Sequence, residues 1–207
     1  MREREARSST ARTGTAPSPG IASTRSRLRP IGVREASLRE TRFGLAPDGE
    51  GWFVVNAAES RWRDWGPLGL NCDFEGKRPF RQLGINLNRL LPGQPMGLYH
   101  RERHQEGFLV LAGECLLFVE GEERLLAAWD FFHCPGGTAH IIVGAGDGPS
   151  LVLACGGRGG RKGLDYVVDP ATLRHGVGVA TPTTKPAEAY ARFPHPTRVR
   201  CGEDWLP

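Results

Sequence analysis

Residues 92–144 have the sequence PGQPMGLYHRERHQEGFLVLAGECLLFVEGEERLLAAWDFFHCPGGTAHIIVG. Short apolar or alternating runs in this stretch are separated by turn residues at 92–93, at Gly121 and at 135–137. Runs of this length between Gly and Pro are typical of β-strands. No sustained 3.6-residue periodicity indicates a helix in their place. The stretch therefore predicts short strands joined by tight turns, as in an all-β sandwich or barrel.

The same pattern extends outward, from about residue 50 to residue 155. It predicts strands at 52–56, 83–91, 107–112, 114–120, 123–128, 130–134, 140–144 and 150–155. No internal repeat is visible, so we expect one barrel, which we place at residues 45–157. The content of 39% hydrophobic and 24% charged residues in 207 is typical of a soluble globular protein.

Residues 158–207 are predicted to form a short helical extension that packs on the barrel. Asp169 is a suitable N-cap, Pro170 suits the first helical position, and Gly176 follows the expected end of one or two helical turns. A second short helix is predicted over residues 186–193. Three aromatic side chains are expected to face the barrel: Tyr190, Phe193 and Trp205.

Residues 1–30 are rich in Arg, Ser, Thr, Pro and Gly and contain almost no large apolar side chain. Such a segment cannot bury enough surface to offset its chain entropy, so we predict a disordered tail. The chain has a formal charge of +4, but residues 1–34 alone carry +6, which leaves −2 for the rest. Because the basicity lies in the tail, we do not expect nucleic acid as a partner of the folded body. For the tail we favour an upstream mis-assigned start, because it has no aromatic residue to stack on bases; an arm that contacts nucleic acid or an acidic partner is the alternative.

The cysteines and the apolar content bear on the compartment. Five cysteines are widely spaced without a CxxC pair: Cys72, Cys115, Cys134, Cys155 and Cys201. Buried, reduced thiols are the expectation for such a set, and Cys115 and Cys155 stand inside apolar runs. No apolar stretch is long enough to span a bilayer, and the N-terminus lacks the apolar core of a secretory signal. We therefore expect a cytoplasmic protein without a membrane partner.

Two linked motifs within residues 92–144 resemble the signature of the cupin superfamily. In the first motif, His100 stands at the first His of a His-x-His pair, Glu106 at the following Glu, and Gly113 comes after six further residues. In the second, PGGTAH at 135–140 matches Pro-x-Gly-x-x-His. The resemblance covers about half the chain. It implies a single cupin β-barrel, that is, a double-stranded β-helix or jelly roll.

Four positions depart from the cupin pattern. Glu102 replaces the second His of the pair, and Gly93 lies one residue further from His100 than usual. In the second motif, Trp129 stands at the opening Gly and Gly144 at the closing Asn. The change at Glu102 alters the ligand set and leaves the identity of a bound metal open.

The resemblance implies a site for one divalent metal ion inside the barrel. His100, Glu102, His104 and Glu106 share one parity, so in an extended segment their side chains converge on one face. Cupin barrels turn that face inward and add the His at the position of His140. Imidazoles and carboxylates buried there need compensation, and such N/O ligands suit Fe, Mn, Ni, Cu or Zn.

The predicted ligands are therefore His100, Glu102, Glu106 and His140. His104 is the rival for the fourth place, because a bulge before Glu106 would rotate His104 inward and Glu102 outward. If Glu102 is not a ligand, it is the candidate general base. The alternative without a metal is a cupin barrel that has lost its metal site, in which charged residues such as Glu102 lie on a solvated strand edge.

Members of the cupin superfamily carry out dioxygenation, isomerisation and decarboxylation. The resemblance thus implies a metal-dependent enzyme, of dioxygenase or isomerase type, that acts on a small organic substrate. The alternative is a non-enzymatic barrel that binds a small molecule or a metal for sensing or storage. Cupins commonly pair through edge strands, so we expect a homodimer, with 52–56 as the candidate edge.

Overall fold

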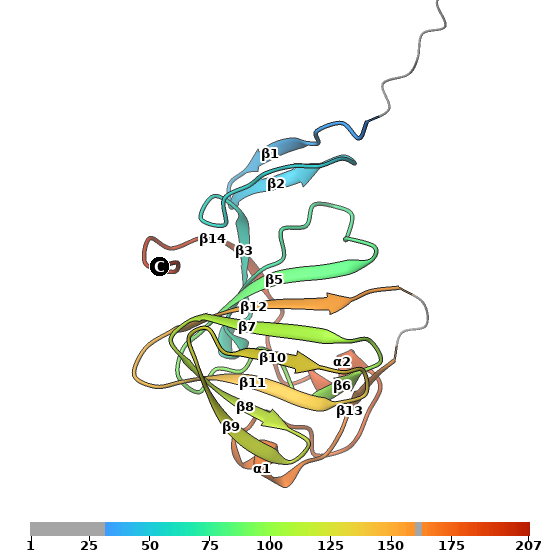
Figure 1. Ribbon diagram of the computed structural model, residues 1–207, viewed down its shortest axis with the longest axis vertical. Coiled ribbons are helices and arrows are strands. Elements are labelled where there is room, and N and C mark those ends of the chain that lie inside the picture. Colours follow the sequence, from blue (N-terminus) through green and yellow to red (C-terminus); the bar gives the residue numbers. More distant parts are fainter. Residues whose placement is uncertain (1–31, 160–162) are drawn as a thin grey trace, which may run out of the picture. The chain divides into compact units, whose positions relative to one another are not determined.

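In residues 32–159 and 163–207, which the computed structural model describes, fourteen β-strands carry almost all of the regular structure (Figure 1). Their bounds are β1 (Ser37–Thr41), β2 (Gly44–Asp48), β3 (Arg61–Asp64), β4 (Leu70–Cys72), β5 (Leu83–Leu90), β6 (His100–Glu102), β7 (Glu106–Ala112), β8 (Glu114–Val119), β9 (Glu122–Ala127), β10 (Phe131–Cys134), β11 (Ala139–Ala145), β12 (Ser150–Gly157), β13 (Leu164–Tyr166) and β14 (Thr197–Arg200). The helices are a 3₁₀ turn at Gly66–Leu68, α1 (Pro170–Arg174) and α2 (Pro186–Ala189). The predicted disordered tail, residues 1–30, lies outside the described residues.

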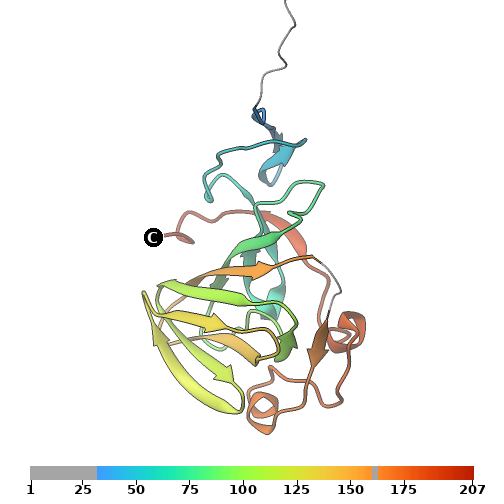
Figure 2. The same cartoon turned by 45° about the vertical axis from the view of Figure 1, so that its right-hand side comes forward.

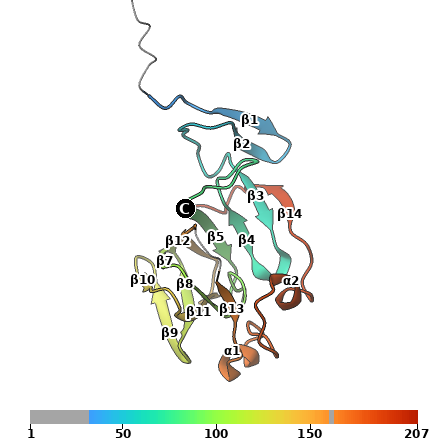
Figure 3. The same ribbon diagram turned by 90° about the vertical axis from the view of Figure 1, so that its right-hand side faces the viewer.

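The barrel is formed by two antiparallel sheets. One has seven strands in the order β10-β7-β12-β5-β4-β3-β14, and the other has five in the order β13-β6-β11-β8-β9. Figures 1 and 3 show the two sheets from two sides. A separate hairpin pairs β1 with β2. The predicted all-β fold, a cupin barrel of the jelly-roll type, is confirmed.

The core of the barrel lies between the inner faces of the two sheets. One sheet contributes Leu90, Val110 and Val152, and the other contributes Leu117 and Ile142, all at most 2% exposed. Each such side chain stabilises the fold by about 1.5–3 kcal/mol on burial. The alternation of these residues in the sequence is what made the strands between 83 and 155 predictable.

The predicted strand at 52–56 is wrong. Trp52 forms only an isolated bridge with Glu35, and Val54 is 79% exposed. Phe53 stacks on Phe80, and Asn56 accepts hydrogen bonds that start the next turn, so the segment contacts the molecule without a ladder partner. The homodimer stays a prediction, without the edge strand that suggested it.

Two of the departures from the cupin motif lie where the backbone conformation or the packing favours glycine. Trp129 has a φ of 77°, a left-handed conformation that Gly adopts without strain. At Gly144, a Cβ atom would lie 2.3 Å from the carbonyl oxygen of Leu91, so no side chain fits. The first departure keeps the turn but strains it, and the second allows two chain segments to pack closely.

The C-terminal segment adds a strand to each sheet, which the sequence did not predict. β13 pairs with β6, and β14 pairs with β3. Between these strands, α1 begins after Asp169, whose side chain accepts a hydrogen bond from the Thr172 backbone N–H as predicted. α2 ends at Ala189, before the predicted end at 193. Figure 2 shows this segment, coloured orange to red, along one side of the barrel.

The aromatic side chains of this segment pack as predicted. Tyr190 and Phe193 join a cluster around the fully buried Leu98, and the Trp205 ring meets Trp62 edge-on at 5.6 Å. In the part of the chain that the structure describes, no helix has the length and apolar character needed to cross a membrane.

The cysteines are all unpaired thiols. Cys72, Cys115 and Cys134 are buried as predicted, whereas Cys155 and Cys201 are only partly buried. Burial raises the pKa of Cys72 to about 11. At neutral pH this cysteine is therefore a neutral thiol that packs as a small apolar side chain.

Candidate metal centre

Two histidines of the site lie side by side in the five-stranded sheet. In the antiparallel ladder of β6 and β11, His100 is directly opposite His140. Residues opposite each other in such a ladder point to the same face. Their rings lie with centroids 5.1 Å apart, and His140 is buried.

The third residue comes from the other sheet. After β6 the chain bends at residues 103–104 and enters the seven-stranded sheet as β7, whose first residue is Glu106. One ligand atom each from His100, Glu106 and His140 lie within 4.8 Å of one another. The site thus bridges the two sheets, and its geometry depends on the barrel being closed at this point.

Hydrogen bonds to backbone carbonyls fix both imidazole rings. The Nδ1 atom of His100 lies 2.7 Å from the Leu98 carbonyl oxygen, and Nδ1 of His140 lies 3.1 Å from that of Thr138. Because a carbonyl can only accept, each Nδ1 carries the proton and donates it. Each Nε2 therefore has a free lone pair, the arrangement that metal-binding histidines show.

Glu106 has a buried carboxylate oxygen without a hydrogen-bond partner among the described residues. Its Oε2 atom is buried, has no hydrogen-bond partner among the described residues and lies 3.4 Å from Nε2 of His140. Burial, with a smaller contribution from the charge of Glu102, raises the pKa of Glu106 to about 8. Buried carboxylates normally have an electrostatic or hydrogen-bonding partner. The Oε2 atom of Glu106 lacks one among the described residues.

The two histidines are held in their neutral form. Burial, and then the neighbouring His100, lower the pKa of His140 to about 4. Burial also lowers the pKa of His100. At neutral pH both rings are neutral, which is the state required of a metal ligand.

The two rivals for a fourth ligand are placed differently. Oε1 of Glu102 lies 3.8 Å from Nε2 of His100, with 37% of the side chain exposed. His104 lies in the bend and is partly exposed, and the group within 4.8 Å includes neither residue. The extended segment on which the parity argument for residues 100–106 depends is interrupted, since β6 ends at Glu102 and the chain bends at residues 103–104. The role of Glu102 as ligand or base stays a prediction.

The three residues face a cavity of about 560 Å³. Apolar side chains of the barrel, among them Met96 and Phe108, line it together with the metal group. Tyr190 and His195 of the C-terminal segment also line it. The sequence did not indicate that these two side chains belong to the site, because their position depends on how the segment folds back along the barrel.

Three asparagines in the cavity wall were also missed: Asn71, Asn86 and Asn88. A signal was present, since Asn86 and Asn88 alternate with apolar residues in the predicted strand 83–91. Polar side chains at inward positions of a strand indicate a lined cavity rather than a packed core.

Residues 86–155 match the family model described as a cupin domain. This matched range contains the three residues of the metal group and the core of both sheets. The chain therefore contains a cupin domain, which spans about a third of its length. In this cupin, β1 to β4 and the C-terminal segment lie outside the matched range.

Several solved structures are similar to parts of this cupin. A putative sugar phosphate isomerase from Acidithiobacillus ferrooxidans is 31% identical over 42% of this chain and 56% of its own, with a TM-score of 0.40. A sugar phosphate isomerase of the cupin superfamily from Silicibacter pomeroyi is 29% identical over 44% and 59%, with a TM-score of 0.41. KdgF from Halomonas sp. is 25% identical over 53% and 96%, with a TM-score of 0.45. The cupin therefore spans less than two thirds of the first two proteins. No protein with curated annotation matches it significantly.

Proposed function

We propose that this cupin is a metal-dependent enzyme that acts on a small organic substrate by dioxygenase- or isomerase-type chemistry. The proposed ligands of one divalent ion are His100, Glu106 and His140. The observation that carries the proposal is the buried Oε2 atom of Glu106, which has no hydrogen-bond partner and faces two imidazoles with free Nε2 lone pairs.

The donor set fits a transition metal. Two neutral imidazoles and one carboxylate are ligands that Fe, Mn, Ni, Cu and Zn accept. Three protein ligands leave positions for a substrate or water, whereas structural Zn sites are closed by four. When bound, such an ion would act as a Lewis acid that polarises a substrate oxygen or activates dioxygen or water.

The chain itself would supply binding, a dry environment and a base. Met96 and Phe108 exclude water from the inner cavity, which strengthens electrostatic interactions there. Glu102 lies beside His100 with 37% of its side chain exposed, so it is the candidate to exchange a proton with a bound substrate. The backbone carbonyls of Leu98 and Thr138 accept hydrogen bonds from the two imidazoles and so keep both in the tautomer that carries the proton on Nδ1.

Metal analysis of matched variants tests the ligand assignment. Untagged protein prepared without chelators is expected to contain close to one equivalent of Fe, Mn, Ni, Cu or Zn. His140→Ala and Glu106→Gln are expected to lose it. The control, His133→Ala, removes an exposed histidine of β10 and should retain the metal. Glu102→Gln decides whether that residue is the fourth ligand.

A turnover experiment then separates an enzyme from a binding barrel. Metal-loaded wild type and Glu106→Gln are incubated with pooled small organic acids and sugars under air and analysed by mass spectrometry. Conversion of a compound by the wild type alone would support the enzyme. Saturable binding without conversion would contradict it and support a sensing or storage barrel.

A further inference from the structure

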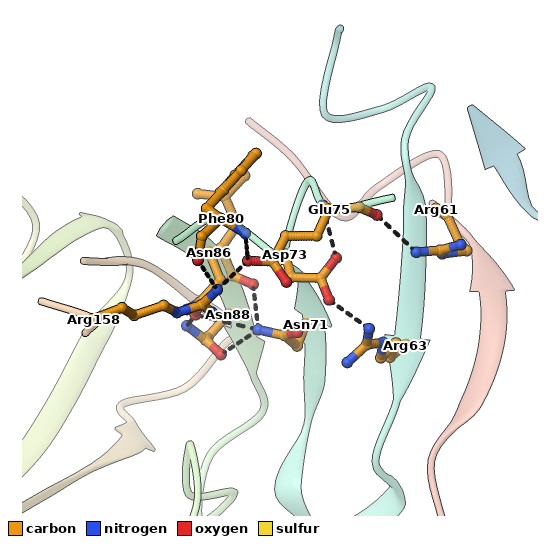
Figure 4. A network of polar contacts seen from close by, with 10 residues as sticks. Arg61, Arg63, Asn71, Asp73, Glu75, Phe80, Asn86, Asn88 and Arg158 are labelled. Atoms are coloured by element: carbon orange, nitrogen blue, oxygen red, sulfur yellow. Dashed lines mark hydrogen bonds and ion pairs between the residues drawn. The ribbon is translucent and has the colours of Figure 1, made fainter. Parts of the chain in front are cut away.

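Three asparagine side chains form a ring on the inner face of the seven-stranded sheet (Figure 4). Asn71 on β4 is directly opposite Asn88 on β5, and Asn86 follows on the same face of β5. Asn86 is opposite Ala154, which is opposite Phe108 in the barrel core. The ring therefore faces the interior.

The three amides bind one another. Nδ2 of Asn71 donates to Oδ1 of Asn86 at 3.2 Å and to Oδ1 of Asn88 at 3.1 Å. Nδ2 of Asn88 donates to the same Oδ1 of Asn86 at 2.6 Å. The Asn86 oxygen thus receives two hydrogen bonds, and both N–H groups of Asn71 are used. These bonds fix the orientation of all three side chains.

The ring leaves hydrogen-bonding groups free for a ligand. Among the described residues, the amino group of Asn86 and the carbonyl oxygen of Asn71 have no hydrogen-bond partner, and both residues line the cavity. A free donor and a free acceptor in one wall match a group that both accepts and donates, such as a hydroxyl or a carboxamide. An anionic group matches less well, since it would meet the carbonyl oxygen of Asn71.

Neighbouring ion pairs hold the wall in place (Figure 4). Arg63, opposite Asn71 on β3, pairs with Asp73 at 2.6 Å. Arg158, after β12, pairs with Glu75 and holds the loop that follows β4. The ring is therefore part of a fixed wall, a condition for selective binding.

The ring and the metal group are separated by a short span of the same sheet. Asn86 on β5 and Glu106 on β7 have β12 between them. Glu106 is level with Gly84, two residues along β5 from Asn86. Two strand spacings of about 4.8 Å and two residues of about 3.3 Å along the strand place the backbones of Asn86 and Glu106 roughly 12 Å apart. A small linear molecule can reach both at once.

We propose that the asparagine ring is the second anchor of the substrate and selects a neutral hydroxyl or carboxamide at its distal end. The oxygen atoms at the other end of the same molecule bind the metal. This inference rests on the proposed function, because the first anchor is the ion held by His100, Glu106 and His140. It adds the class of substrate: a small oxygen chelator with an uncharged polar terminus.

Matched pairs of chelators test the second anchor. The probes are linear alkyl hydroxamic acids of four to eight carbons and their analogues with a terminal carboxamide in place of the methyl group. Binding to the metal-loaded protein is measured by calorimetry. At the chain length that spans the cavity, the wild type should bind the carboxamide about tenfold more tightly, as expected for two neutral hydrogen bonds.

Two variants complete the test. Asn86→Leu should lose this preference or reverse it while it stays folded and keeps its metal, with a lower melting temperature because Asn71 and Asn88 lose their shared acceptor. The control, Met96→Leu, changes another cavity residue and should keep the preference. Equal affinities of every pair for the metal-loaded wild type, or an unchanged preference in Asn86→Leu, would overturn this inference alone. A wild type that holds no metal would overturn the proposed function, and the two-anchor arrangement with it.

Discussion

Replacing Glu106 with Gln is expected to stabilise the metal-free protein while it abolishes the metal site. Only 16% of the Glu106 side chain is exposed, and its buried Oε2 atom has no hydrogen-bond partner among the described residues. Gln has nearly the same shape and stays neutral at every pH. The substitution therefore removes the unfavourable ionisation without leaving a cavity.

The magnitude follows from the pKa of Glu106, which burial raises from 4.5 to about 8. At about 1.4 kcal/mol per pH unit, this difference corresponds to about 5 kcal/mol when the carboxyl is fully ionised. The folded protein holds this proton more tightly than the unfolded chain does. The stability linked to the protonated form of Glu106 is thus fully present below pH 4.5 and is lost as the pH rises through about 8.

His140 acts in the opposite direction. Its pKa is lowered from 6.5 to about 4, so the stability linked to its neutral form is present above pH 6.5 and is lost as the pH falls through about 4. Both proteins contain His140. The difference between their stabilities therefore isolates Glu106.

The assay is urea unfolding of metal-free wild type and Glu106→Gln, with chelator and reductant, at steps from pH 5 to pH 8.5. Glu106→Gln should exceed the wild type by less than about 1 kcal/mol at pH 5 and by about 3–5 kcal/mol at pH 8.5. A difference that does not change with pH would refute the argument that the protein buries this carboxylate without compensation.

Two further substitutions test the explanation of the motif departures. Trp129 is 74% exposed and has a φ of 77°. Trp129→Gly should stabilise the fold by about 1 kcal/mol, since this left-handed conformation strains residues other than Gly. Thermal unfolding checks this, and Trp129→Ala, which keeps the strain, should show no gain. Gly144→Ala should destabilise by about 1–3 kcal/mol, because its Cβ would meet the Leu91 carbonyl. Gly148→Ala has open space and should be neutral; equal effects of the two would contradict the packing argument.

The barrel strands were predictable because their signal is local. Between residues 83 and 155, apolar residues alternate and turn residues separate the runs, and seven predicted strands there correspond to β5 and β7 to β12. The segments 61–64 and 197–200 are short and rich in arginine, and they become β3 and β14 by pairing with each other, with β3 also paired to β4. The local sequence of either segment does not predict such long-range pairing.

The metal group was predictable from the motif, but its surroundings were not. His100, Glu106 and His140 converge as expected. The parity argument that grouped them with Glu102 and His104 assumed one strand, whereas the chain changes sheets at residues 103–105. Which sheet a strand joins depends on the closed barrel and not on the alternation of its residues.

Anomalous diffraction from crystals of the metal-loaded protein tests the central claim most directly. The account predicts one anomalous peak bonded at about 2.0–2.2 Å to Nε2 of His100, Nε2 of His140 and a carboxylate oxygen of Glu106. A peak bonded to other residues, or a fully loaded protein with no peak between these three side chains, would contradict it.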